Sequence, residues 1–202
     1  MTTKTAHTDH PVHALVSERF SPYAWKDESV DAETLRSLFE AARWSASSYN
    51  EQPWRFLVAR REEPEAFAKL LSGLVEANQV WAQHAPVLAV GLTIRSFSRN
   101  GKPNKAYQHD LGLAAATLTF EATSRGLAVH QMIGIDPQRI HDLYALPDDV
   151  EPLTALAIGF AGEASALPDG LREREEAPRS RKPLGEIVFS ERWEQSAAFL
   201  RD

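Results

Sequence analysis

The chain contains no cysteine among its 202 residues. Disulfide bonds, thiolate nucleophiles, Cys-X-X-Cys redox pairs, cysteine-ligated zinc and iron–sulfur clusters are therefore all excluded. If the protein carries out redox chemistry, it must use an organic cofactor.

The two common glycine-rich phosphate-binding motifs, Gly-X-Gly-X-X-Gly and the P-loop, are also missing. A nucleotide phosphate would have to be bound by arginines and hydroxyl groups. Two short segments carry such groups: Arg19 and Ser21 near the start of the chain, and Arg179, Arg181 and Lys182 near its end. Each cluster taken alone is more typical of a solvated surface than of a binding site.

The formal net charge is −6, so no basic surface invites nucleic acid, and none is expected as a partner. The longest apolar run, near residues 86–94, has the length of a strand rather than of a membrane span. The polar first residues lack the apolar core of a signal peptide. A cytoplasmic location without membrane contact is therefore the expectation.

Helical and strand-like patterns alternate along the chain. Helices are expected over 31–44 after an Asp31 cap, over 63–85 with a break near Gly73, over 106–125 before Gly126, and over 136–146. Strands are expected over 55–60, 86–94, 127–133 and 153–162. Residues 186–189 look strand-like and residues 190–200 helix-like. This alternation predicts a layered α+β or α/β domain.

Residues 1–10 are expected to form a flexible tail, and residues 11–202 a single domain. The charged stretch 165–185 has too few apolar residues to build a core of its own. If the strand-like segment 186–189 pairs with a sheet, that sheet could belong to another subunit, which would make the fold an intertwined homodimer.

The connection from Ser45 to Trp54 is unusually rich in hydroxyl and amide side chains for a link between a helix and a strand. A short connection needs only a few turn residues. Serine catalysis by Ser47 or Ser48 is disfavoured because there is no Gly-X-Ser-X-Gly motif. The segment therefore requires another explanation.

The histidines suggest no metal site. Three of them, His7, His10 and His13, lie close together, but an intervening proline and their place in the tail argue against a fixed site. His130 lies in an apolar strand, which favours a hydrogen-bonded core histidine. His109 begins a helix, and both a pocket wall and a helix-terminus contact remain open for it.

Taken together and in order, five segments resemble the nitroreductase family of FMN-dependent oxidoreductases. They are RFSPYAW (19–25), ARWSASSYNEQPWRFLVA (42–59), DLGLAAATLTFEATSRGL (110–127), HQMIGI (130–135) and RSRKPLGEIVF (179–189). The QPW segment is fairly specific, and the first and last segments are weak singly. The order of the five segments is kept from Arg19 to about Trp193.

The resemblance implies an α+β fold, a nitroreductase-like mixed β-sheet flanked by helices, in an intertwined homodimer. Residues 163–202 would be a C-terminal extension that wraps the partner subunit. Two FMN molecules would lie in grooves between the subunits. The residues implied to bind FMN are Arg19, Phe20, Ser21, Tyr23, Ser47, Ser48, Asn50, Gln52, Gln131, Met132, Ile133, Gly134, Arg179 and Arg181.

Within this set, the resemblance implies separate roles. Arg19, Ser21, Arg179 and Arg181 would hold the phosphate end, residues 47–52 would come from the neighbouring subunit, and residues 132–134 would line the isoalloxazine ring. A substrate pocket would involve Asn78, Trp81 and His109. No metal ion and no catalytic side chain are implied, because the chemistry occurs at the flavin N5 atom.

The implied activity is transfer of hydride from NAD(P)H, through FMN, to a nitroaromatic, quinone or similar small-molecule acceptor by a ping-pong mechanism. The alternatives are a non-catalytic FMN-binding or storage protein and a specialised flavin oxidase of the same fold. Three positions depart from the family pattern. Tyr23 stands where a basic residue is frequent, Ala46 near a usual proline, and Ile133 where glycine is common.

Overall fold

A computed structural model describes residues 4–200. A four-stranded sheet with strand order β1-β2-β4-β3 lies at its centre. The strands are β1 (Trp54–Arg60), β2 (Val87–Ile94), β3 (Ala128–Met132) and β4 (Val150–Gly159). The α+β class is confirmed, but the sheet that was expected to be mixed is antiparallel at each of its three pairings.

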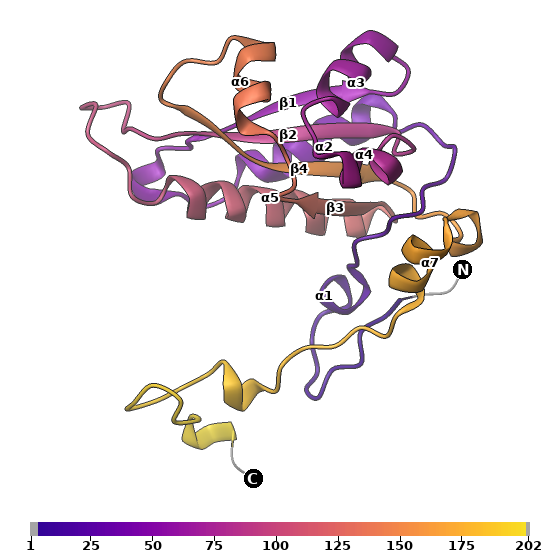
Figure 1. The fold of residues 1–202 in the computed structure, drawn as a ribbon. Coiled ribbons are helices and arrows are strands. Elements are labelled where there is room, and N and C mark those ends of the chain that lie inside the picture. The colour runs from indigo at the N-terminus through magenta and orange to yellow at the C-terminus, as the bar shows by residue number, and fades with distance from the viewer. Residues whose placement is uncertain (1–3, 201–202) are drawn as a thin grey trace.

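Helices cover both faces of the sheet, as Figure 1 shows. The longest helix, α5 (Tyr107–Ser124), packs with α2 (Ala32–Arg43) against one face. The other face is covered by α3 (Pro64–Leu71), α4 (Glu76–Ala82) and α6 (Pro137–Tyr144). Two further short helices, α1 (Ala14–Glu18) and α7 (Asp169–Glu176), lie beside this layered body.

Strand β2 contributes side chains to both hydrophobic cores, which explains its unbroken apolar sequence. Val87 and Ala89 belong to the core beneath α2 and α5, whereas Leu88 and Val90 belong to the core on the opposite face. Alternate residues of a strand point to opposite faces, so a strand covered on both sides must be apolar throughout.

The helix boundaries follow the predicted signals. The Asp31 side chain accepts a hydrogen bond from the Thr34 N–H at 2.8 Å and caps α2. Just past α5, Gly126 adopts a φ of 75°, a left-handed conformation that glycine takes without a Cβ clash. The helical pattern over 63–85 is interrupted as expected, because α3 ends before Gly73 and α4 begins after it.

Two predictions for the end of the chain are wrong. Residues 186–189 form no strand of the sheet, since Phe189 makes only an isolated bridge to Ser196. Residues 190–200 form no α-helix, because Glu191 and Glu194 take left-handed φ values of 63° and 64°. A strand needs a neighbour along its edge, and this segment lies away from the chain's own sheet (Figure 1).

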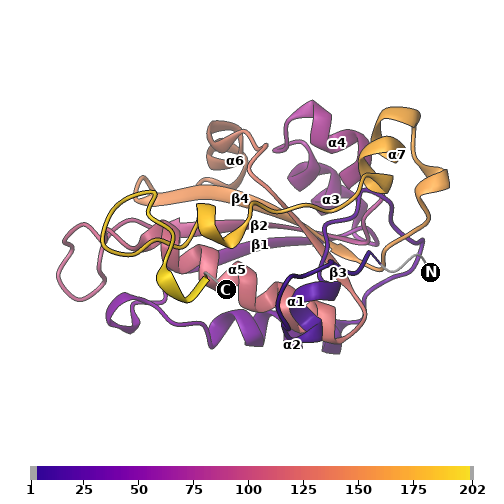
Figure 2. The same cartoon turned by 90° about the horizontal axis from the view of Figure 1, so that it is seen from below.

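We call residues 177–200 the C-terminal arm. The arm follows α7 and extends away from the layered body in Figure 1, and in Figure 2, seen from below, it crosses in front of that body. Several of its large apolar side chains face solvent, with Trp193 80% and Phe199 79% exposed. Exposed aromatics in this number are typical of a segment that packs against a partner.

Candidate functional site

Three arginines that are distant in sequence meet in one pocket of about 340 Å³, which we call the arginine pocket. Arg19 follows α1, while Arg179 and Arg181 lie at the start of the C-terminal arm. Arg19 Nη1 donates a hydrogen bond to Ser21 Oγ at 3.2 Å, and Arg179 Nη1 donates to the carbonyl oxygen of Ser17 at 2.7 Å. The pocket thus joins the two basic clusters that the sequence places about 160 residues apart.

The arginine pocket has an excess of positive charge, because its lining contains one carboxylate, that of Glu175, against several cationic side chains. Burial lowers the pKa of Arg19, and the charges of Arg179 and Arg181 lower it further. The pKa of Arg179 is also lowered, by burial and then by Arg181. Among residues 4–200, none of the three forms an ion pair with a carboxylate. Such a cluster favours an anion that satisfies several guanidinium groups at once.

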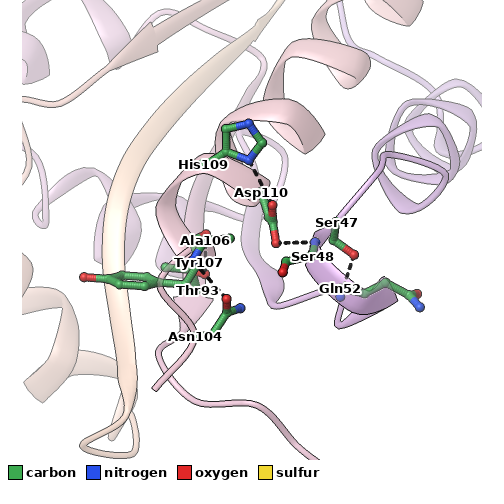
Figure 3. A network of polar contacts seen from close by, with 9 residues as sticks. All are labelled: Ser47, Ser48, Gln52, Thr93, Asn104, Ala106, Tyr107, His109 and Asp110. Carbon is green, nitrogen blue, oxygen red and sulfur yellow. Dashed lines mark hydrogen bonds and ion pairs between the residues drawn. The ribbon is translucent and has the colours of Figure 1, made fainter. Parts of the chain in front are cut away.

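The polar segment Ser47–Gln52 is held in an unusual backbone conformation. Tyr49, Asn50 and Gln52 have φ values of 54°, 57° and 52°. Non-glycine residues rarely adopt this region, and such strain concentrates at functional sites. Ser47 Oγ accepts the Gln52 N–H at 3.0 Å, which closes the loop on itself (Figure 3). The side chain of Asn50 remains exposed.

A buried carboxylate anchors this segment to the central helix. Asp110, in the first turn of α5, is 1% exposed, and its Oδ2 accepts the Ser48 N–H at 3.0 Å. Its Oδ1 lies 3.0 Å from Nδ1 of His109, whose ring is exposed (Figure 3). Sequence reasoning did not assign Asp110 a role. The sequence feature that could have drawn attention to Asp110 is its acidic side chain in the first turn of a largely apolar helix.

The chain turns sharply after β3, where the isoalloxazine ring was expected. Met132 is buried, whereas Ile133 is 72% exposed. The carbonyl oxygen of Gly134 accepts hydrogen bonds from Asn78 Nδ2 at 2.9 Å and from the Val75 N–H at 3.1 Å. A Cβ on Gly134 would lie 2.4 Å from Asn78 Nδ2, so a larger residue would displace the amide that holds the turn.

The other residues predicted for the flavin site or the substrate pocket contact the core, the arginine pocket or neighbouring helices. Gln131 Nε2 donates to Thr119 Oγ1 at 2.9 Å, which ties β3 to α5. Trp81 is 2% exposed and packs against Tyr23 and His130, with ring centroids 5.3 Å and 4.3 Å away. Phe20 lines the arginine pocket. His130 is the hydrogen-bonded, half-buried histidine that its strand position indicated.

Within one chain the predicted flavin-binding residues form two separate groups. The segment Ser47–Gln52 lies at the end of α2 that points away from α1 and α7, and Figures 1 and 2 agree on this. The arginine pocket lies on the opposite side, beside α1 and α7. None of residues 47–52 is among the residues that line the pocket.

Three further findings concern the described residues as a whole. No helix among residues 4–200 is long and apolar enough to cross a membrane. In the same range no three histidine, aspartate or glutamate side chains are grouped as metal ligands would be. A larger pocket of about 1100 Å³ lies along α2 and includes Trp44, Val58 and Arg125, away from the groups above.

Residues 16–160 match the model of the Nitroreductase family. A Streptomyces coelicolor protein provisionally named as an NADH dehydrogenase/NAD(P)H nitroreductase is 28% identical over 165 residues, covering 72% of this chain and 81% of its own length. The crystal structure of an oxidoreductase containing FMN aligns with a TM-score of 0.89 and 32% identity, covering 97% of this chain and all of that one.

A nitroreductase-like protein from Desulfovibrio desulfuricans, solved in complex with FMN, aligns with a TM-score of 0.70 and 25% identity over 92% of this chain and 99% of its own. The fold of this chain is thus shared with solved structures of nitroreductase-like proteins. The chain belongs to the nitroreductase family.

Proposed function

We propose that this chain is an FMN-dependent oxidoreductase that takes hydride from NAD(P)H and reduces a nitroaromatic, quinone or similar acceptor by a ping-pong mechanism. The observation that carries the proposal is the arginine pocket. Its three guanidinium groups have no carboxylate ion pair among the described residues, and burial together with their neighbouring positive charges lowers the pKa of Arg19 and of Arg179. A doubly charged phosphate monoester would relieve this repulsion.

The residues present fit FMN. Arg19, Arg179 and Arg181 supply planar guanidinium donors for a phosphate, and Ser21 adds a hydroxyl at the mouth of the same pocket. When bound, FMN supplies a hydride acceptor at N5 that passes its electrons to a second substrate. The backbone of the Ile133–Gly134 turn would then border the ring, and the buried Met132 would support it.

A second copy of the chain would complete the site. Residues 47–52 lie at the end of the layered body away from α1 and α7 (Figure 2), and none of them lines the arginine pocket of their own chain. In a homodimer they would reach the FMN of the neighbouring subunit, with Asn50 and Gln52 as amide donors. The exposed aromatics of the C-terminal arm and the half-exposed Leu113 and Phe120 on α5 would provide the apolar contact.

The test is spectroscopic. The purified protein is saturated with FMN, its flavin absorbance is recorded, and NADH or NADPH is added anaerobically. Bleaching within seconds, followed by recovery on addition of a quinone or nitroaromatic, supports the proposed activity. A flavin that stays oxidised with both nucleotides would indicate a binding or storage protein. A protein that takes up no FMN would contradict the proposal altogether.

A further inference from the structure

The peptide group between Pro22 and Tyr23 is held at both ends by side chains that are distant in sequence. The Pro22 carbonyl oxygen lies 2.9 Å from His130 Nδ1, and the Tyr23 N–H donates to Glu175 Oε2 at 2.9 Å. The carbonyl and N–H of a trans peptide point in opposite directions. His130 on β3 and Glu175 on α7 therefore grip the same peptide from two sides.

Glu175 is an unusual residue for its surroundings. It is only 8% exposed and lines the arginine pocket, where Lys4, Arg174 and the three arginines of that pocket also lie. Yet it makes no ion pair within 4 Å in the described part of the chain, and the Tyr23 N–H is its hydrogen-bond donor. A buried carboxylate placed this way serves a backbone group rather than neutralising the cations.

His130 holds the other end of the peptide through a defined tautomer. A carbonyl oxygen can only accept, so Nδ1 must carry the hydrogen. Burial lowers the pKa of His130 and Arg19 lowers it further, although the hydrogen bond to the Pro22 carbonyl oxygen opposes this. The ring also packs against Tyr23 and Trp81, with centroids 4.9 Å and 4.3 Å away. These contacts restrict the direction of the Tyr23 side chain.

We propose that Glu175 and His130 are positioning residues for the FMN site. Their hydrogen bonds fix the 22–23 peptide, and this orients the preceding residues Arg19 and Ser21 toward the arginine pocket. The other two arginines of that pocket, Arg179 and Arg181, come from the C-terminal part of the chain. Glu175 lies four residues before Arg179, so its bond to Tyr23 also sets the register between the two arginine-bearing segments. This inference rests on the proposed function, because it concerns the same cofactor site.

Replacing Glu175 separates positioning from charge. Glu175→Gln keeps an oxygen that accepts the Tyr23 N–H but removes the negative charge, whereas Glu175→Ala removes both. We expect Glu175→Ala to weaken FMN binding about tenfold, equivalent to about 1.4 kcal/mol. Glu175→Gln should bind FMN as tightly as wild type or more tightly. Glu176→Ala, an exposed neighbour on the same helix, serves as the charge-matched control and should change nothing.

The alternatives give different patterns. If Glu175 acted only as a negative charge near the phosphate, both substitutions at this position would tighten FMN binding. If both bound FMN as wild type does, the proposed positioning role would be wrong. Wild-type protein that fails to take up FMN would instead overturn the proposed function, so the two failures are distinguishable.

A second measurement requires no cofactor. Hydrogen exchange of the Tyr23 amide in the FMN-free protein should accelerate in Glu175→Ala and stay slow in Glu175→Gln. If Glu175→Ala does not fold, the His130 end provides the same comparison. His130→Asn keeps a donor near the Nδ1 position, and His130→Leu removes it. FMN affinity that is equal in these two variants would contradict the role assigned to His130.

Discussion

The carboxylate of Asp110 accepts the backbone N–H of Ser48 across 3.0 Å, which fastens the strained polar loop to the first turn of the central helix. The two residues are 62 positions apart in sequence. The bond involves the Ser48 main chain, so it constrains where the following amides point without using a serine hydroxyl.

Replacing Asp110 should loosen this loop. Asp110→Ala leaves the Ser48 N–H without its acceptor, which costs about 1–3 kcal/mol for a buried donor. We expect a corresponding loss of unfolding free energy in urea and faster release of FMN. Asp110→Asn retains an acceptor oxygen and should lose less. Ser48→Ala keeps the main-chain donor and is the matched control for the unfolding free energy. An Asp110→Ala protein with unchanged stability would show that the bond is unimportant.

Asn50→Ala should weaken FMN retention while leaving the fold and the dimer intact, because the exposed amide is a proposed donor to the partner's flavin. Alanine at the observed φ of 57° would also be strained by about 1 kcal/mol. Asn50→Gly removes the amide without that strain. FMN dissociation constants that rise in both variants support the amide; a normal value in Asn50→Gly alone would assign the effect to backbone strain.

Tyr23→Arg should raise the flavin reduction potential, on the order of 30 mV for a two-electron couple if the added charge contributes about 1.4 kcal/mol. A cation near the flavin favours its reduced, anionic form, and the tyrosine hydroxyl brings no charge. Tyr23→Phe preserves packing against Trp81 and His130 and should leave the potential near the wild-type value. A redox titration of wild type and the two variants measures the flavin potential. A potential that does not rise in Tyr23→Arg would show that a positive charge at this position does not favour the reduced flavin.

Local patterns were sufficient to predict most elements of the fold. The Asp31 cap and the continuous apolar run of β2 each depend on neighbours in sequence or on a face of one element. The C-terminal arm was mispredicted because strand-like composition at 186–189 has no sheet edge within the same chain to complete it.

The candidate site was predictable to a lesser degree. Its arginines, hydroxyls and amides stand in recognisable motifs, so their grouping around Arg19 and around Asn50 could be expected. Asp110 and Glu175 could not be found this way, because each acts on a backbone N–H that lies 62 or 152 residues away. Almost every residue has a main-chain N–H, so the partner of such a side chain cannot be recognised from its residue type.

The pH dependence of stability should reveal the burial of Glu175. Burial raises the pKa of its carboxyl above the ordinary value, although the Tyr23 N–H and Lys4 oppose this. The folded state therefore binds this proton more tightly than the unfolded state. The stabilisation is fully present below the unfolded pKa and is lost as pH rises through the folded pKa. Above the folded-state pKa the ionised, buried carboxylate opposes folding.

Glu175→Gln removes this titration, so the variant should gain stability relative to wild type as pH rises above the ordinary glutamate pKa, and the difference should level off once the wild-type carboxyl is fully ionised. Urea unfolding at several pH values measures the difference directly. Glu176→Gln, an exposed neighbour, should show no such trend. A stability difference between Glu175→Gln and wild type that is constant across this range would mean that the carboxyl titrates alike in the folded and unfolded states.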